Sequence, residues 1–167
     1  MRTLVFGNSG SGKSSYAKRL AAAQGLTHFD LDTIVWEPGQ VAVARAAAAV
    51  NQSLQTFIDT HADWVIEGCY GDLVSTAAEH CDELIFLNPG RKACLANNRQ
   101  RRWEPHKYAS MATQEAMLEH LQAWVASYDE RADDCSYRRH RALFDSHAGP
   151  KREIRALPEF AEGPPPP

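Results

Sequence analysis

Eight residues near the start of the chain combine closely spaced glycines with a lysine and a serine that could bind phosphate. Residues 7–14 read Gly-Asn-Ser-Gly-Ser-Gly-Lys-Ser and match the pattern G-x-x-x-x-G-K-[ST] in full. Glycines let successive backbone N–H groups curl around phosphate oxygens in conformations that a Cβ atom would oppose. We therefore predict that Lys13 contacts the β- and γ-phosphates of a nucleoside triphosphate and that the Ser14 hydroxyl ligates Mg²⁺. The predicted nucleotide-binding residues are Gly7, Asn8, Ser9, Gly10, Ser11, Gly12, Lys13, Ser14 and Ser15.

Two carboxylates one residue apart form a second candidate group. Asp30 and Asp32 lie where a short apolar stretch containing Phe29 and Leu31 is expected to end a strand. During phosphoryl transfer one such acid can order Mg²⁺-bound water while the other accepts a proton from the attacking hydroxyl. We predict that Asp30 assists the metal and that Asp32 is the base and contacts the acceptor. The alternative is a solvated turn or a helix cap, since Asp is common in both.

A third group follows the apolar run at residues 64–66. Glu67 ends that run, as an acid ends the strand of a Walker B-like arrangement that holds Mg²⁺ through water. Gly68 and Tyr70 come next and are predicted to contact the acceptor, Gly68 by letting it approach the backbone. Cys69 between them is expected to fill space, because phosphoryl transfer needs no covalent step. The alternative is a charged strand end followed by a plain turn.

A basic segment with a proline break is the fourth group. Arg99 and Arg102 lie three residues apart, so they share a helix face, whereas Arg101 is expected to point elsewhere. We predict that Arg99 and Arg102 belong to a lid at about residues 99–112 that closes over the site and stabilises the transferred phosphoryl group. The alternative is a solvated basic end of a helix, which is common because cations favour that position.

Strand and helix patterns alternate along the chain and indicate how these groups are positioned. Strands are expected at residues 3–6, near 29–31, at 64–66, 84–87 and 153–157. Helices are expected at 13–24, 42–59 and 91–101, after a cap at Thr113, and after a cap at Ser136. This alternation predicts an α/β fold with an open parallel sheet covered by helices on both faces. Ligands of such sheets bind at the carboxyl ends of the strands, where the acids and the glycine-rich loop should converge.

Composition limits the remaining possibilities. The length of 167 residues suits one domain, predicted at 1–158, followed by a disordered proline-rich tail at 159–167. The net charge of −3 gives no electrostatic reason to expect nucleic acid as a partner. No apolar run is long enough to span a membrane, and the early first strand leaves no room for a signal peptide. The four cysteines lack C-x-x-C spacing, which favours reduced thiols in a cytoplasmic protein, a monomer or a homodimer.

With these motifs in place, the chain resembles the small P-loop kinases of the adenylate and shikimate kinase group. It is most similar to the bacterial branch of adenylate-kinase-related, DNA-topology-modulation-like proteins, which pairs an F-D-L-D-like and a W-V-I-[DE]-G-x-Y element with the P-loop. Those elements are residues 29–32 and 64–70 in this sequence, and residues 102–108 resemble a subgroup signature. The resemblance implies a three-layer P-loop NTPase fold with a five-stranded parallel sheet in the order 2-3-1-4-5. It also implies ATP, Mg²⁺, a small helical lid and a small-molecule phosphoryl acceptor.

Alternatives to this function remain open at the level of sequence. Arg45 is the only arginine between Arg19 and Arg91, and both shikimate kinase and nucleoside monophosphate kinases grip their acceptor with arginines from that region. A shikimate kinase or a nucleoside monophosphate kinase proper is therefore a weaker alternative. A nucleotide-binding regulatory or partner-binding protein with little transfer activity is another, although binding alone does not need the paired acids.

Overall fold

Five parallel strands form the centre of the molecule. The computed structural model describes residues 1–37, 40, 43–101, 103 and 108–156. The strands are β1 (Arg2–Gly7), β2 (Thr27–Asp30), β3 (Trp64–Gly68), β4 (Glu83–Leu87) and β5 (Lys151–Ile154). Their order is β2-β3-β1-β4-β5 with every neighbouring pair parallel, which confirms the expected sheet.

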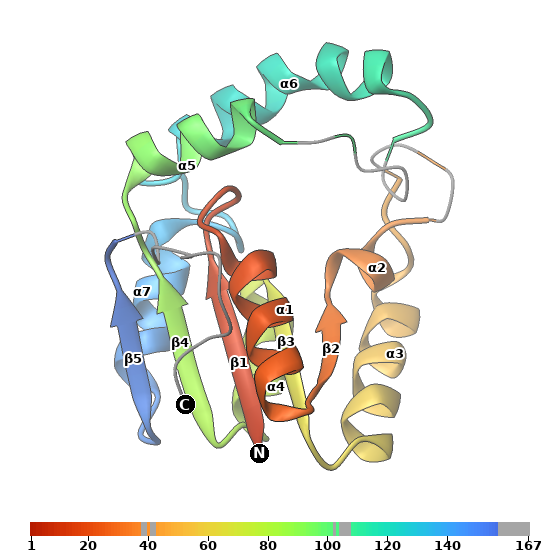
Figure 1. Cartoon of the computed structure of the whole chain (residues 1–167), viewed down its shortest axis with the longest axis vertical. Helices are drawn as coiled ribbons and strands as arrows, with labels where there is room; N and C mark the ends of the chain where they lie inside the picture. The colour runs from red at the N-terminus through yellow and green to blue at the C-terminus, as the bar shows by residue number, and fades with distance from the viewer. Residues whose placement is uncertain (38–39, 41–42, 102, 104–107, 157–167) are drawn as a thin grey trace.

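Helices cover both faces of this sheet (Figure 1). Helix α1 (Lys13–Gln24) packs on one face, where its Ala17 and Leu20 meet alternate apolar residues of the central strands. Helices α3 (Ala47–Thr60), α4 (Gly71–Ala78) and α7 (Tyr137–Ser146) pack on the other face. Strand residues alternate between these two layers, as the two-residue period of a strand requires. Both faces of β1 and β4 are therefore buried, which explains why these strands are continuous apolar runs.

Three further helices lie toward the carboxyl edge of the sheet (Figure 1). The short α2 (Asp32–Val35) follows β2, and α5 (Arg91–Arg99) follows β4. The long α6 (Met111–Ala126) crosses above the strand ends. Among the described residues, no helix combines the length and the apolar character needed to cross a membrane.

Several boundaries differ from the sequence-based expectation. Ser110 caps α6, because its side chain accepts a hydrogen bond from the Thr113 backbone N–H, so the cap expected at Thr113 was wrong. The cap expected at Ser136 is confirmed by its hydrogen bond from the Arg139 N–H. Strand β5 begins two residues before the predicted strand, because an edge strand reading Lys-Arg-Glu-Ile is too polar to be recognised by apolar content. Helices α2 and α4 were not predicted.

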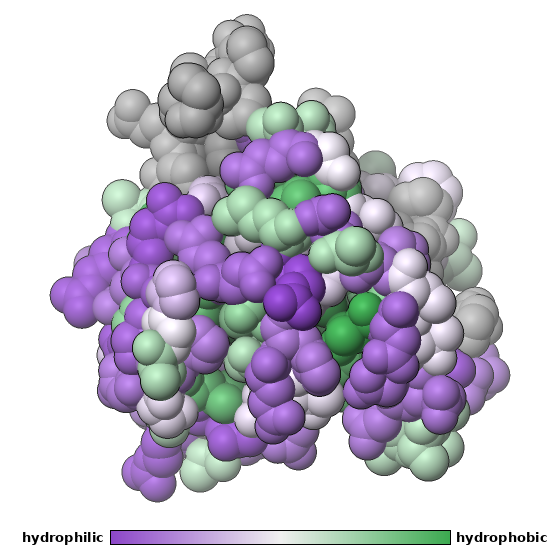
Figure 2. Space-filling view, turned by 90° about the horizontal axis from the view of Figure 1, so that it is seen from below, coloured by the Kyte–Doolittle hydropathy of each residue, from purple (hydrophilic) through white to green (hydrophobic). Residues whose placement is uncertain are grey.

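The amino-terminal edge of the sheet forms the lower face of the molecule in Figure 1. Figure 2 shows this lower face as mostly hydrophilic, with hydrophobic residues visible only in small separate areas. The groups predicted to do chemistry lie instead at the opposite edge, where β1, β2 and β3 end. The predicted tail at 159–167 and parts of the predicted lid lie outside the described residues.

Candidate active site

The loop between β1 and α1 has the backbone conformation of a phosphate cradle. Gly7, Gly10 and Gly12 have φ angles of 153°, 80° and 89°, which residues with a Cβ rarely adopt. A Cβ on Gly10 would lie 2.3 Å from the Cys94 carbonyl oxygen, so α5 packs directly against this loop. The Ser11 hydroxyl is buried and has no hydrogen-bond partner among the described residues. The loop thus offers a donor and a curved backbone to a ligand.

Lys13 begins α1 and is buried against the loop. Its side chain is largely shielded from solvent, and its ammonium group donates to the Asn8 carbonyl at 3.3 Å. A lysine ammonium has three donor positions, and a neutral carbonyl compensates a buried charge only weakly. Lys13 is therefore a cation held at the mouth of the loop, at the place predicted for it.

One face of α5 contacts the loop, and sequence reasoning missed it. The Asn97 side chain donates to the Gly10 carbonyl at 2.8 Å, and the Asn98 side chain donates to the Ser9 carbonyl at 3.2 Å. Arg101 follows and donates to the Ser9 hydroxyl at 3.3 Å. Positions 94 and 98 lie four residues apart on α5, which is the signal that could have shown this face.

The predicted lid arginines are thus arranged differently from the expectation. Arg99 is exposed at the end of α5, whereas Arg101 reaches the loop. The helix ends at Arg99, so the face expected to join it with Arg102 does not continue. Arg102 itself lies outside the described residues. The catalytic role of Arg99 stays a prediction, and Arg101 is the arginine that the geometry favours.

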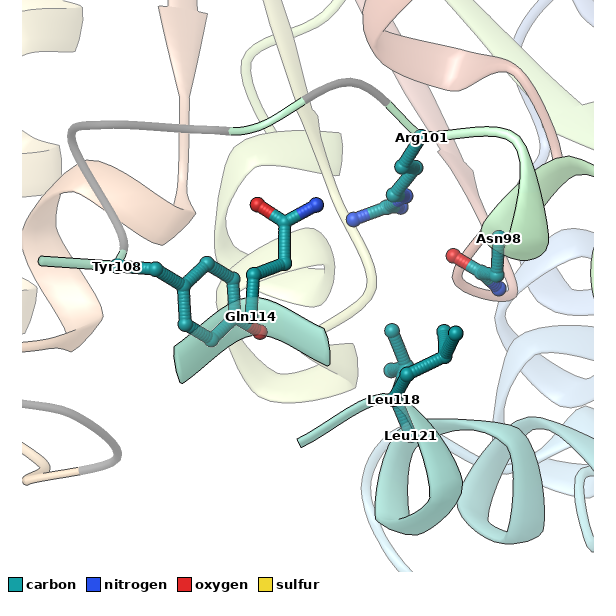
Figure 3. Close-up of a pocket in the computed structure, with 6 residues that line it drawn as sticks. All are labelled: Asn98, Arg101, Tyr108, Gln114, Leu118 and Leu121. Atoms are coloured by element: carbon teal, nitrogen blue, oxygen red, sulfur yellow. The ribbon is translucent and has the colours of Figure 1, made fainter. Parts of the chain in front are cut away.

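A small pocket lies between α5 and α6 beside the loop. Its lining residues are Asn98, Arg101, Tyr108, Gln114, Leu118 and Leu121. Figure 3 shows the Arg101 side chain extending into this space toward Gln114, with the two leucines of α6 on another side. Helix α6 also contacts the loop directly, because the Asn8 side chain donates to the Val125 carbonyl at 3.3 Å. Helix α6 and the loop between β1 and α1 are therefore joined by a hydrogen bond.

Glu67 ends β3 as a buried carboxylate next to Ser14. Burial raises the pKa of this carboxyl, but interactions with His28, Lys13 and Ser14 outweigh burial and hold the pKa below its ordinary value. The His28 Nε2 lies 3.8 Å from Oε1, too far for a hydrogen bond. Oε1 is buried with no hydrogen-bond partner in the described part of the chain. Glu67 is therefore a buried anion with an unused oxygen.

Asp30 stands beside Glu67, since the two residues are register partners of β2 and β3. One Asp30 carboxylate oxygen accepts the Asp32 backbone N–H at 2.9 Å. Within the described residues, no three His, Cys, Asp or Glu side chains form a group able to hold a metal ion. Asp30 and Glu67 are two neighbouring carboxylates. Mg²⁺ usually keeps several waters and takes only one or two carboxylates plus phosphate oxygens, so two acids would be enough for it.

Asp32 begins α2 and is held by an aromatic residue 38 positions away. The Tyr70 hydroxyl donates to Asp32 Oδ1 at 2.5 Å and accepts from the Trp36 indole N–H at 2.9 Å. Burial, with Cys69 and Asp32 nearby, raises the pKa of Tyr70 far above its ordinary value. The phenol therefore keeps its proton and remains a donor to Asp32. This joins two residues that were predicted separately and adds Trp36, which was not predicted.

The residues between Glu67 and Tyr70 also have packing roles. A Cβ on Gly68 would lie 2.7 Å from the Leu31 side chain, so close packing by itself explains this glycine. Its contact with an acceptor stays a prediction. Cys69 is buried, as expected for a residue that fills space.

His140 lies on the short basic helix α7 and is fully buried. Its Nε2 lies 2.7 Å from the Cys69 carbonyl oxygen, and its Nδ1 lies 2.7 Å from the Tyr128 hydroxyl. A carbonyl only accepts, so Nε2 carries the proton and Nδ1 accepts from Tyr128. Burial lowers the pKa of His140 to about 4, with the Cys69 carbonyl opposing the shift and Lys13 adding to it.

This buried histidine predicts a loss of stability in mild acid. The unfolded chain takes up the proton near pH 6.5 and the folded chain only near pH 4, so stability falls as pH drops through that window. A difference of that size is worth about 3 kcal/mol. Urea unfolding at several pH values should show this decline in the wild type and a flatter profile in His140→Gln. Equal slopes in both proteins would contradict the prediction.

The fold is shared with solved kinases. No protein-family model and no curated protein sequence matches the chain. A sugar kinase from Janibacter sp. HTCC2649, solved without ligand, is similar in structure with a TM-score of 0.52 and 15% identity over 92% of this chain and 83% of that one. That similarity supports a P-loop kinase fold, and at this identity it shows the fold alone.

Two weaker structural similarities were found. A gluconokinase from Sinorhizobium meliloti 1021 has a TM-score of 0.44 and 17% identity over 92% of this chain and 82% of that one. A shikimate kinase from Acinetobacter baumannii in complex with shikimate has a TM-score of 0.42 and 13% identity over 85% and 90%.

Proposed function

We propose that the chain is a kinase that transfers the γ-phosphoryl group of ATP, with Mg²⁺, to a hydroxyl group of a small molecule. The observation that carries this proposal is the pairing of a phosphate-binding loop with Asp32 at the same edge of one sheet, where Tyr70 orients that acid. A protein that only bound nucleotide would not need an oriented carboxylate beside the loop. The family resemblance implies only a small-molecule acceptor, whereas this proposal specifies that the acceptor group is a hydroxyl.

The phosphate half of the site fits a triphosphate. Gly10 and Gly12 have positive φ angles, a conformation that lets backbone N–H groups curl around phosphate oxygens, and the buried Ser11 hydroxyl adds an unused donor. Lys13 lies at the N-terminus of α1, where the helix dipole also favours negative charge. Buried donors without partners are costly in a folded protein, so a ligand that pairs with them is the simplest reason for their presence.

The metal half of the site fits a divalent cation held by few protein ligands. The Ser14 hydroxyl would bind Mg²⁺ directly, while Glu67 and Asp30 would hold its waters. The buried and unused oxygen of Glu67 supports this assignment, because an ionised carboxylate in a dry site calls for positive charge. Held by Ser14, Glu67 and Asp30, a metal ion would supply positive charge against the charge that develops on the phosphate oxygens.

The acceptor half supplies a base. Asp32 accepts the proton of the acceptor hydroxyl as the oxygen bonds to the γ-phosphorus, and the bond from that phosphorus to the β,γ-bridging oxygen breaks to release ADP. Tyr70 donates to Asp32 and fixes its direction. Arg101, which donates to the Ser9 hydroxyl, would stabilise the transferred group, and α6 would exclude water.

ADP release in a coupled assay tests this proposal. We expect release from Mg–ATP to depend on an added acceptor when sugars, other polyols, hydroxy acids and nucleosides are compared. Removing the metal with EDTA should abolish that release, and mass spectrometry should find the phosphoryl group on a hydroxyl of the acceptor. Tight Mg–ATP binding with no stimulation by any hydroxyl compound would favour a regulatory protein instead.

A further inference from the structure

His140 connects two parts of the molecule that belong to opposite sides of the candidate site. Its Nε2–H donates to the carbonyl of Cys69, in the turn that joins β3 to α4. Its Nδ1 accepts from Tyr128, just after the end of α6. Both contacts are short, and the His140 and Tyr128 side chains are almost completely buried. Hydrogen bonds shielded from water in this way hold geometry more firmly than exposed ones.

The Cys69 end of this connection leads to the proposed base. Tyr70 follows Cys69 directly, and its hydroxyl is the group that donates to Asp32. The peptide plane between Cys69 and Tyr70 carries the carbonyl that His140 holds, so rotating that plane would also move the backbone of Tyr70. Trp36 donates to the same hydroxyl and therefore reports its position.

The surroundings leave His140 little freedom to move. Its ring meets Phe6 edge-on at a centroid distance of 5.4 Å and Phe86 at 6.1 Å. Phe6 lies in β1, immediately before the phosphate-binding loop. A phenylalanine or leucine could fill the same space, but neither could hold a carbonyl on one side and a hydroxyl on the other.

We propose that His140 is a positioning residue that sets the Cys69–Tyr70 turn and thereby aims Tyr70 at Asp32. This inference rests on the proposed function, because it assigns His140 to the acceptor half of that site. It distinguishes the two nitrogen atoms: the Nε2 contact serves the turn, and the Nδ1 contact anchors the histidine to the segment after α6.

A matched pair of variants separates these contacts. The amide nitrogen of glutamine can replace Nε2 and keep the bond to Cys69, whereas asparagine reaches only the position of Nδ1. We expect His140→Asn to lower kcat/KM for the acceptor about tenfold, as the loss of one buried hydrogen bond would. His140→Gln should recover most of that loss, and Mg–ADP affinity measured by calorimetry should stay near the wild-type value in both. Equal losses in the two variants would overturn the proposal.

A second measurement does not depend on turnover. With 5-fluorotryptophan incorporated, the ¹⁹F resonance of Trp36, assigned by its absence in Trp36→Phe, should shift in His140→Asn and stay in place in His140→Gln. An unchanged resonance in His140→Asn would overturn the proposal even if the protein proves not to be a kinase. If the Trp36 resonance shifts in His140→Asn as expected but no acceptor stimulates ADP release, only the proposed function is refuted.

The wild-type protein provides a test that needs no variant. At neutral pH the ¹⁵N shifts of the His140 ring should show a protonated Nε2 and an unprotonated Nδ1. The opposite tautomer could not donate to the Cys69 carbonyl and would also overturn the proposal.

Discussion

Replacing Asp32 with asparagine is expected to lower kcat for the acceptor by a factor of about 10² to 10⁴, the contribution of a positioned general base. Asparagine has the same shape and can still accept the Tyr70 hydroxyl, so the geometry of the pair should survive. It cannot take up the acceptor proton. Steady-state kinetics with the acceptor identified by ADP release would measure the acceptor half of the site. Calorimetric binding of Mg–ADP would measure the nucleotide half. Nucleotide binding should be nearly unchanged.

Two further variants make this result interpretable. Tyr70→Phe keeps the base and removes the hydroxyl that donates to Asp32 and accepts from Trp36, so a loss of about tenfold is expected. Asp59→Asn changes an exposed aspartate on α3 and should leave turnover as it is. If Asp32→Asn turned over the acceptor at the wild-type rate, Asp32 would not be the base, whatever the Tyr70 variant showed.

Elements with a strong local signal were predictable. Helix α1 spans Lys13–Gln24 as expected, because its apolar spacing ends at Gly25, which adopts the left-handed conformation with a φ angle of 67°. The buried strands β1, β3 and β4 were recognised because both of their faces are apolar. Helix α4 was missed because it starts at Gly71, which reads as a turn residue. The glycine is explained by a tertiary contact, since a Cβ on Gly71 would lie 2.5 Å from the Asp134 carbonyl oxygen.

The site was predictable to the extent that it follows from the sheet. Parallel strands end at one edge, so the loop, Asp30 and Glu67 were expected to converge, and the register of β2 with β3 places the two acids side by side. Contacts between side chains distant in sequence could not be predicted. The Cys69 contact of His140 spans 71 positions and depends on how α7 packs against the sheet. No periodicity encodes such a pairing.

The helix face expected to carry the lid arginines ends early for a local reason. The prediction extended one helix face through Arg99 and residue 102, but α5 ends at Arg99. Arg101 then points back toward Ser9 instead of continuing around the helix. A single helix boundary thus separates Arg99 from Arg101, and boundaries are the least certain part of any sequence-based assignment.

Lys13→Met should lower kcat/KM for Mg–ATP by a factor of about 10² to 10³, the range found when one preorganised donor to developing charge is removed. Lys13 is the buried cation of the phosphate-binding loop, and its ammonium group donates to the Asn8 carbonyl at 3.3 Å. Methionine fills similar space without the charge. The measurement is initial velocity at varied Mg–ATP with the acceptor held constant.

The same substitution should not destabilise the protein without nucleotide. Removing Lys13 relieves the cost of a buried ammonium group but also takes away one of the groups that stabilise the buried Glu67 carboxylate. These two effects on folding oppose each other, so the melting temperature should change little while activity falls. Lys18→Met is the matched control, since Lys18 is exposed on the same helix and should affect neither quantity. A Lys13→Met variant that lost activity only because it unfolded would show a lower melting temperature. That outcome would make Lys13 a structural residue and remove the strongest argument that the loop binds phosphate.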